Sequence, residues 1–71
     1  MKNYREDSQH LYSYNGPVFL FDRCIDEYWT AETYAVSEKK ARSNLTYQYK
    51  QENGYLPNSK ITLTGKITIT E

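Results

Sequence analysis

Residues 37–54, SEKKARSNLTYQYKQENG, constrain the fold most, because this is the only stretch that carries the signals of a complete helix. Ser37 can accept a hydrogen bond from a free backbone N–H of the first turn, and Glu38 suits the positive end of the helix dipole. No Gly or Pro follows until Gly54, which can end a helix in the left-handed conformation. We therefore expect one helix that starts at Glu38 and stops before Gly54.

This helix is expected to pack on one surface only. At helical spacing, its apolar stripe consists of Ala41, Leu45 and Tyr49. A stripe this narrow buries one side of a helix and leaves the remainder in water. The rest of the chain must therefore supply one surface that covers the stripe.

The opposite side of the helix carries basic residues and no acidic residue. Its basic residues are Lys39, Lys40, Arg42 and Lys50. Three of them lie in the first half of the helix, where each exposed positive charge opposes the dipole at a cost of ~0.3–1 kcal/mol. Such a broken rule can mark a binding site, although charge runs commonly just solvate a surface. In the second case, the carboxylates expected to balance the helix are Asp22, Asp26, Glu27 and Glu32.

Two apolar stretches before the helix predict an antiparallel hairpin. The run Val18-Phe19-Leu20-Phe21 is apolar on both sides, which is typical of a strand covered on both faces. Residues 22–27 contain the turn, and residues 28–35 form the second strand. The connection is too short for a parallel crossover. Parity places Trp29, Ala31, Thr33 and Ala35 toward the helix, and Tyr28, Thr30, Glu32 and Tyr34 away from it.

The N-terminal part carries weaker signals. Residues 1–9 are polar and without periodicity, so we expect a disordered tail. Residues 10–14 alternate weakly, which leaves room for an extra edge strand. Asn15-Gly16-Pro17 predicts a turn after it, because Asn-Gly is a hairpin signal and Pro17 lacks a ladder donor.

The segment KITLTGKITIT has the clearest strand pattern in the chain. A tight hairpin at Thr64-Gly65 would place its isoleucines on opposite faces, whereas one long strand keeps every aliphatic residue on one face. We therefore favour a single strand over residues 60–70, with a bulge or twist at Gly65. A three-residue loop would also keep the parity and stays open.

Composition limits the classes of protein to which the chain can belong. Its 71 residues include nine basic and nine acidic ones, so it is one small domain without a dominant charge. Neutrality counts against a dedicated nucleic-acid binder, although local clustering matters more. Cys24 is the only cysteine, which fits a reducing compartment. The first ten residues lack the apolar core of a signal peptide, and no run reaches membrane-spanning length, so we expect a cytoplasmic protein.

No combination of residues points to catalysis. The chain has one cysteine and one histidine, His10, with nothing in the sequence to link them. The acidic residues Asp22, Asp26 and Glu27 lack the spacing and the glycine of a calcium loop. We therefore expect a non-enzymatic protein without a metal or cofactor.

Two kinds of binding remain. Lys39, Lys40, Arg42 and Lys50 could meet nucleic-acid phosphates, while Tyr28 and Tyr34 could stack on bases from the outer face of the sheet. The alternative is a protein-interaction module or weak homodimer that uses the apolar residues 18–21 or an unprotected sheet edge.

Four segments of the chain carry a family likeness: Gly16-Pro17-Val18, Trp29, SEKKARSNL at 37–45 and LTGKI at 63–67. With these segments, most of the chain, residues 14–69, resembles a family of small proteins encoded in phages and integrated mobile elements of Gram-positive bacteria. It implies a mobile-element setting in the cytoplasm and no particular chemistry.

Together these patterns predict one α+β domain over residues 10–71. A three-stranded antiparallel sheet is covered by one helix, in the order β-β-α-β, with the optional edge strand at 10–14. The expected role is an accessory one, in which the protein binds nucleic acid through the helix or another protein through the sheet.

Overall fold

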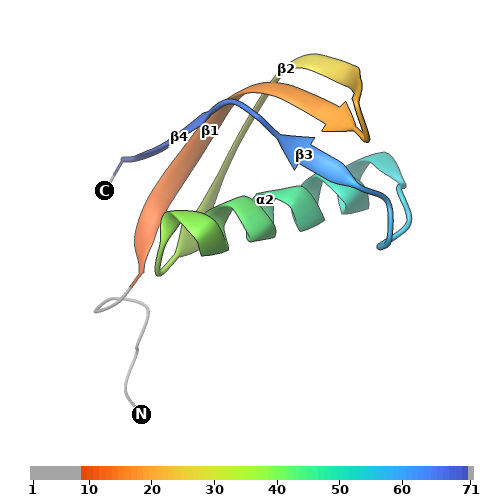
Figure 1. Cartoon of the computed structure of the whole chain (residues 1–71). Coiled ribbons are helices and arrows are strands. Elements are labelled where there is room, and N and C mark those ends of the chain that lie inside the picture. Colours follow the sequence, from red (N-terminus) through yellow and green to blue (C-terminus); the bar gives the residue numbers. More distant parts are fainter. Residues whose placement is uncertain (1–8, 71) are drawn as a thin grey trace.

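The computed structural model describes residues 9–70 as an antiparallel sheet with one helix against one face (Figure 1). The elements are β1 (His10–Leu20), β2 (Arg23–Ala35), α2 (Glu38–Asn53), β3 (Ile61–Leu63) and β4 (Lys66–Ile69). This arrangement confirms the predicted α+β class and the β-β-α-β order. Except for Gln9, the predicted tail lies outside the described residues.

Strand β1 is the centre of the sheet. It pairs with β2 along one side and with both β3 and β4 along the other. The predicted turn at Asn15-Gly16-Pro17 is therefore wrong, and residues 10–14 belong to the central strand. Tertiary pairing overrides the Asn-Gly signal, because Asn15 pairs with Lys66 and Val18 pairs with Leu63 in one continuous alignment.

The hairpin turn is tighter than expected. It consists of Phe21 and Asp22, with Phe21 in the left-handed region at φ 56°, and β2 already begins at Arg23. The predicted loop over residues 22–27 is therefore mostly strand. Bulges in β2 accommodate its additional residues. Gly16 pairs with Trp29 and Val18 pairs with Asp26, so three steps along β2 match two steps along β1.

The core lies between α2 and the concave side of the sheet (Figure 1). The predicted helix stripe of Ala41, Leu45 and Tyr49 is buried, which confirms that prediction. Trp29 packs edge-on against Tyr49, with ring centroids 4.9 Å apart. Burial of a leucine such as Leu45 stabilises the fold by about 1.5–3 kcal/mol.

The apolar run at residues 18–21 is covered on one face only. Val18 is fully buried under α2, but Phe19 is half-buried and Phe21 is 65% exposed. Within residues 9–70, no element covers the outer face of β1.

The C-terminal segment lies along one side of β1 in a single direction, as expected for a single strand. Both β3 and β4 pair with β1 in the same register, with a break at Thr64 and Gly65. Neither a hairpin nor a three-residue loop is formed.

Pro17 explains where the strand breaks. Leu11 accepts a hydrogen bond from Thr70 N–H, and Phe21 N–H donates to Lys60, so alternate residues of β1 direct their backbone groups toward β3 and β4. Pro17 belongs to this set but has no N–H to donate. The ladder consequently opens opposite Pro17, between β3 and β4.

Candidate nucleic-acid interface

The helix that carries the basic residues is fixed at both ends. Ser37 Oγ accepts a hydrogen bond from the backbone N–H of Lys40 at 3.2 Å, as the capping signal predicted. At the other end Gly54 adopts the left-handed conformation at φ 75°, and its N–H donates to the carbonyl of Lys50. These caps fix where the helix that carries the basic side chains begins and ends.

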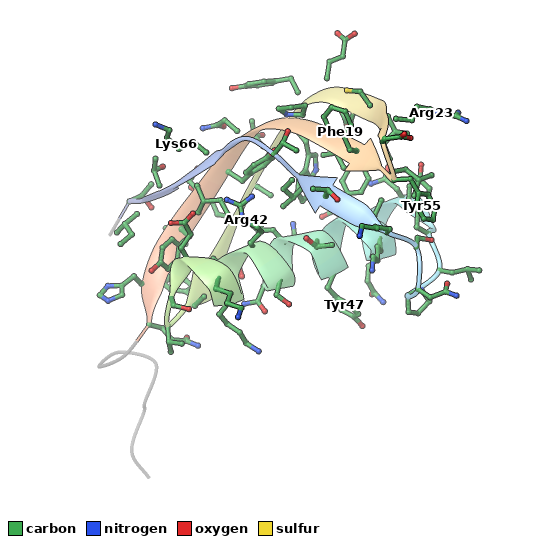
Figure 2. The ribbon with its side chains drawn as sticks, viewed as in Figure 1. Phe19, Arg23, Arg42, Tyr47, Tyr55 and Lys66 are labelled. Atoms are coloured by element: carbon green, nitrogen blue, oxygen red, sulfur yellow. The ribbon has the colours of Figure 1, made fainter. Side chains whose placement is uncertain are left out.

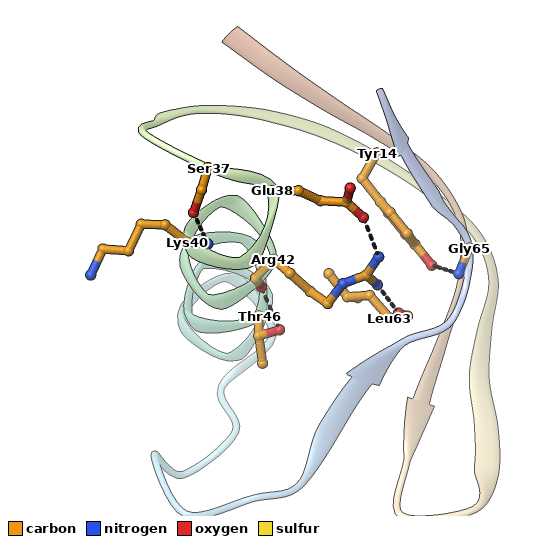
Figure 3. A network of polar contacts seen from close by, with 8 residues as sticks. All are labelled: Tyr14, Ser37, Glu38, Lys40, Arg42, Thr46, Leu63 and Gly65. Carbon is orange, nitrogen blue, oxygen red and sulfur yellow. Dashed lines mark hydrogen bonds and ion pairs between the residues drawn. The ribbon is translucent and has the colours of Figure 1, made fainter. Parts of the chain in front are cut away.

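Arg42 does not belong to an open basic face. Its guanidinium donates a hydrogen bond to the carbonyl of Leu63 in β3 and forms an ion pair with Glu38 at 3.3 Å (Figure 3). The side chain is 36% exposed. Arg42 therefore connects α2 to the edge of the sheet.

Lys50 is also engaged within the molecule. Its Nζ donates to the carbonyl of Pro57 at 2.7 Å, which ties the last turns of α2 to the following loop. On the same face, the hydroxyl of Thr46 donates to the carbonyl of Arg42 at 2.8 Å. The second half of the helix is thus less available to a ligand than its composition predicted.

Lys39 and Lys40 remain as the basic residues open to a partner. Together with Val36, Ser37 and Ser43 they line an open hollow of about 360 Å³ beside the first turns of α2. Figure 3 shows the Lys40 side chain extending away from the Arg42 contacts. Within residues 9–70, neither ammonium group forms an ion pair. The predicted cluster therefore divides into two structural residues and two free ones.

The expected balance of the helix by strand carboxylates does not take the form of ion pairs within residues 9–70. The one ion pair of the described chain joins Arg42 to Glu38, and none involves Asp22, Asp26, Glu27 or Glu32. These strand carboxylates lie on the hairpin and on β2, whereas Glu38 precedes Arg42 by one helical turn. An i,i+4 partner on the same helix reaches the guanidinium more directly.

Asp26 instead serves a contact that no sequence pattern indicated. Its carboxylate accepts from Tyr49 Oη at 3.4 Å and from the backbone N–H of Tyr28 at 3.2 Å. Burial and the negative charge of Asp26 raise the pKa of Tyr49 above its ordinary value. Tyr55 stacks on the same ring at 6.1 Å. Because 23 residues separate Asp26 from Tyr49, only the fold brings them together.

The outer face of the sheet keeps its predicted aromatic residues. Tyr28 is 68% exposed and Tyr34 is 49% exposed. The carbonyl of Tyr34 accepts a hydrogen bond from Asn44 of α2 at 3.3 Å. The predicted outward parity of β2 is therefore confirmed, on the face opposite the hollow beside α2.

Other kinds of site find little support in residues 9–70. No group of three or more His, Cys, Asp or Glu side chains lies close enough to hold a metal ion in that part of the chain. Cys24 is exposed, and its Sγ lies 3.5 Å from the carbonyl oxygen of Asp26. Among the described helices, none has the length and apolar character needed to cross a bilayer.

The chain matches no protein-family model, no characterised protein and no solved structure. The resemblance to mobile-element proteins consequently stays a prediction.

Proposed function

We propose that the protein binds nucleic-acid phosphates through the first half of α2. The observation that carries this proposal is the hollow lined by Lys39 and Lys40, whose ammonium groups have no acidic partner in the described part of the chain. The N-terminal end of a helix also carries partial positive charge, which favours an anion. The two ammonium groups and the N-terminal end of α2 therefore all contribute positive potential at this hollow.

The neighbouring residues suit the same ligand. Ser43 lines the hollow and offers a neutral hydroxyl to phosphate oxygens. Tyr47 lies one turn further along α2 and is 59% exposed, pointing away from the sheet in Figure 2. An exposed ring at this place offers a stacking surface to an unpaired base. The phosphate contacts position the ligand, and Tyr47 gives it a preference for single strands.

Arg42 and Lys50 have no part in this proposal. Each already donates to a backbone carbonyl, and release of these contacts would cost the fold a hydrogen bond. The original cluster of four basic residues is thereby reduced to two, which implies modest affinity and a shallow dependence on salt.

The test is charge reversal at the hollow. Fluorescence anisotropy with labelled single-stranded and duplex oligonucleotides should show binding by the natural chain that is lost in the Lys39→Glu, Lys40→Glu double variant. The matched control is Lys60→Glu, Lys66→Glu, which changes two exposed lysines outside the hollow by the same charge.

The dependence on salt gives a second criterion. Two lysine–phosphate contacts predict a slope in log affinity against log salt of about −1.4 for single strands and about −1.8 for duplex DNA. Equal losses in the two double variants would mean that binding follows net charge and not this surface. Absence of binding to either kind of oligonucleotide at low salt would refute the proposal.

A further inference from the structure

The two outer edges of the sheet are not equally closed. On the β3–β4 side, the guanidinium of Arg42 donates a hydrogen bond to the carbonyl of Leu63, and the strand is interrupted at Gly65. On the β2 side, the segment from Trp29 to Ala35 pairs with β1 without any shift of register. Within residues 9–70, no strand pairs with the outer edge of β2. The regular edge is therefore the open one.

The hydrogen bonds of β1 show which residues of β2 face outward. Since Leu11 directs its carbonyl to Thr70, the next residue, Tyr12, directs its backbone groups to its β2 partner Thr33. By alternation along β2, the backbone N–H and C=O groups of Thr30 and Glu32 point away from the sheet. At this edge, the two backbone N–H groups and the two backbone C=O groups of these residues have no hydrogen-bond partner within residues 9–70.

Both ends of this open stretch are already occupied. The N–H of Tyr28 donates to the carboxylate of Asp26 at 3.2 Å. The carbonyl of Tyr34 accepts from the side chain of Asn44 at 3.3 Å. A long peptide strand laid along β2 would meet these occupied groups at each end, so the edge suits a short pairing.

We propose that the stretch Thr30–Glu32 pairs antiparallel with the same stretch of a second copy, about a two-fold axis through Ala31. Thr30 then lies opposite the partner's Glu32, and the two pairs exchange four backbone hydrogen bonds. The next pair outward sets Tyr28 against the partner's Tyr34. There the occupied N–H faces the occupied carbonyl, so the pairing leaves neither group without a bond.

Charge repulsion and backbone hydrogen bonding favour the axis through Ala31 over axes through Thr30 or Glu32. An axis through Glu32 would place two carboxylates directly opposite each other, which destabilises a strand pair. An axis through Thr30 would set the occupied N–H of Tyr28 against the open carbonyl of the partner's Glu32 and lose a bond. Only the axis through Ala31 matches open groups with open groups. The contact is small, so the dimer is weak and reversible, and it does not depend on nucleic-acid binding.

Disulfide trapping tests the axis directly. At a non-hydrogen-bonded pair the two Cα atoms are about 4.5 Å apart, which lies within the disulfide range of about 4.4–6.8 Å. In a Cys24→Ser background, Ala31→Cys should form a covalent dimer under mild oxidation. The control is Thr33→Cys, which lies on the same face with similar exposure. In the proposed dimer its copies are about 13 Å apart along the strands, four residues of offset, so it should stay monomeric.

Sedimentation equilibrium of the natural chain tests self-association independently of the introduced cysteines. The average mass should rise with concentration, and Glu32→Pro should weaken self-association about 10-fold because it removes one outward N–H from each copy. A strict monomer at all concentrations would overturn the proposal. Equal trapping of the two cysteine variants, or a dimer unaffected by Glu32→Pro, would place the contact on another surface and would also overturn it.

Discussion

The hydroxyl of Tyr14 accepts a hydrogen bond from the backbone N–H of Gly65 at 2.9 Å, across the break between β3 and β4 (Figure 3). The same hydroxyl donates to the carbonyl of Pro17. Pro17 cannot donate to the ladder, and the fully buried Tyr14 supplies a side-chain bridge where the backbone bond is missing. One side chain thereby holds together two strands at the point where their own pairing stops.

Tyr14→Phe should therefore destabilise the domain. The change leaves the N–H of Gly65 and the carbonyl of Pro17 without this partner, which costs about 1–3 kcal/mol. Urea unfolding followed by circular dichroism measures the loss. The control is Tyr12→Phe, because Tyr12 is also buried and its hydroxyl has no hydrogen bond within residues 9–70. Equal effects of the two substitutions would show that the bridge contributes nothing.

Gly65→Ala should be harmful for a steric reason. A Cβ at Gly65 would lie 3.0 Å from the carbonyl oxygen of Asn15 and 3.0 Å from the hydroxyl of Tyr14. The first of these is sheet backbone and cannot move aside, so we expect a loss of about 1–3 kcal/mol. Thr64→Ala, at the exposed neighbouring position, is the control and should change the midpoint of thermal unfolding by only a few degrees. A Gly65→Ala variant as stable as this control would contradict the crowding argument.

Local patterns predicted the parts of the fold that depend on local chemistry. The helix, both caps and the single face of the aliphatic residues in 61–69 follow from side-chain spacing and were confirmed. The turn at Asn15-Gly16-Pro17 was wrong, because long-range pairing with β3 and β4 outweighs a local turn preference. The roles of Arg42 and Lys50 could not be foreseen either, since each depends on a carbonyl in a segment that only the fold brings near.

Arg42→Ala should weaken the contact between α2 and β3. The substitution removes the hydrogen bond to the carbonyl of Leu63 as well as the ion pair with Glu38. The ion pair is largely exposed and contributes at most about 0.5 kcal/mol, whereas the charged hydrogen bond contributes about 1.5–3 kcal/mol. Arg42→Ala should thus cost far more stability than Glu38→Gln in the same urea titration.

Lys40→Ala is the matched control for Arg42→Ala, because Lys40 lies on the same helix without an ion pair in the described chain. It should leave stability within about 0.5 kcal/mol of the natural chain. If Arg42→Ala and Lys40→Ala were equally mild, Arg42 would have to be counted again among the residues free to bind phosphate.

Alkaline pH should unfold the domain partly through Tyr49. Burial and the carboxylate of Asp26 raise the pKa of this hydroxyl in the folded state, so the folded chain retains its proton at a pH where the unfolded chain has lost it. The resulting stabilisation is complete below the ordinary tyrosine pKa of 10.0 and is lost as pH rises through the folded-state pKa. Thermal unfolding between pH 8 and 11 should therefore show stability falling across the upper part of this range.

The stability of the Tyr49→Phe variant should fall less steeply over this range, because the variant has no proton to lose at this position. Asp26→Asn removes the negative charge beside the Tyr49 hydroxyl, so the stability of this variant should also fall less steeply with pH. A Tyr49→Phe variant with the same slope as the natural chain would show that other tyrosines account for the whole effect.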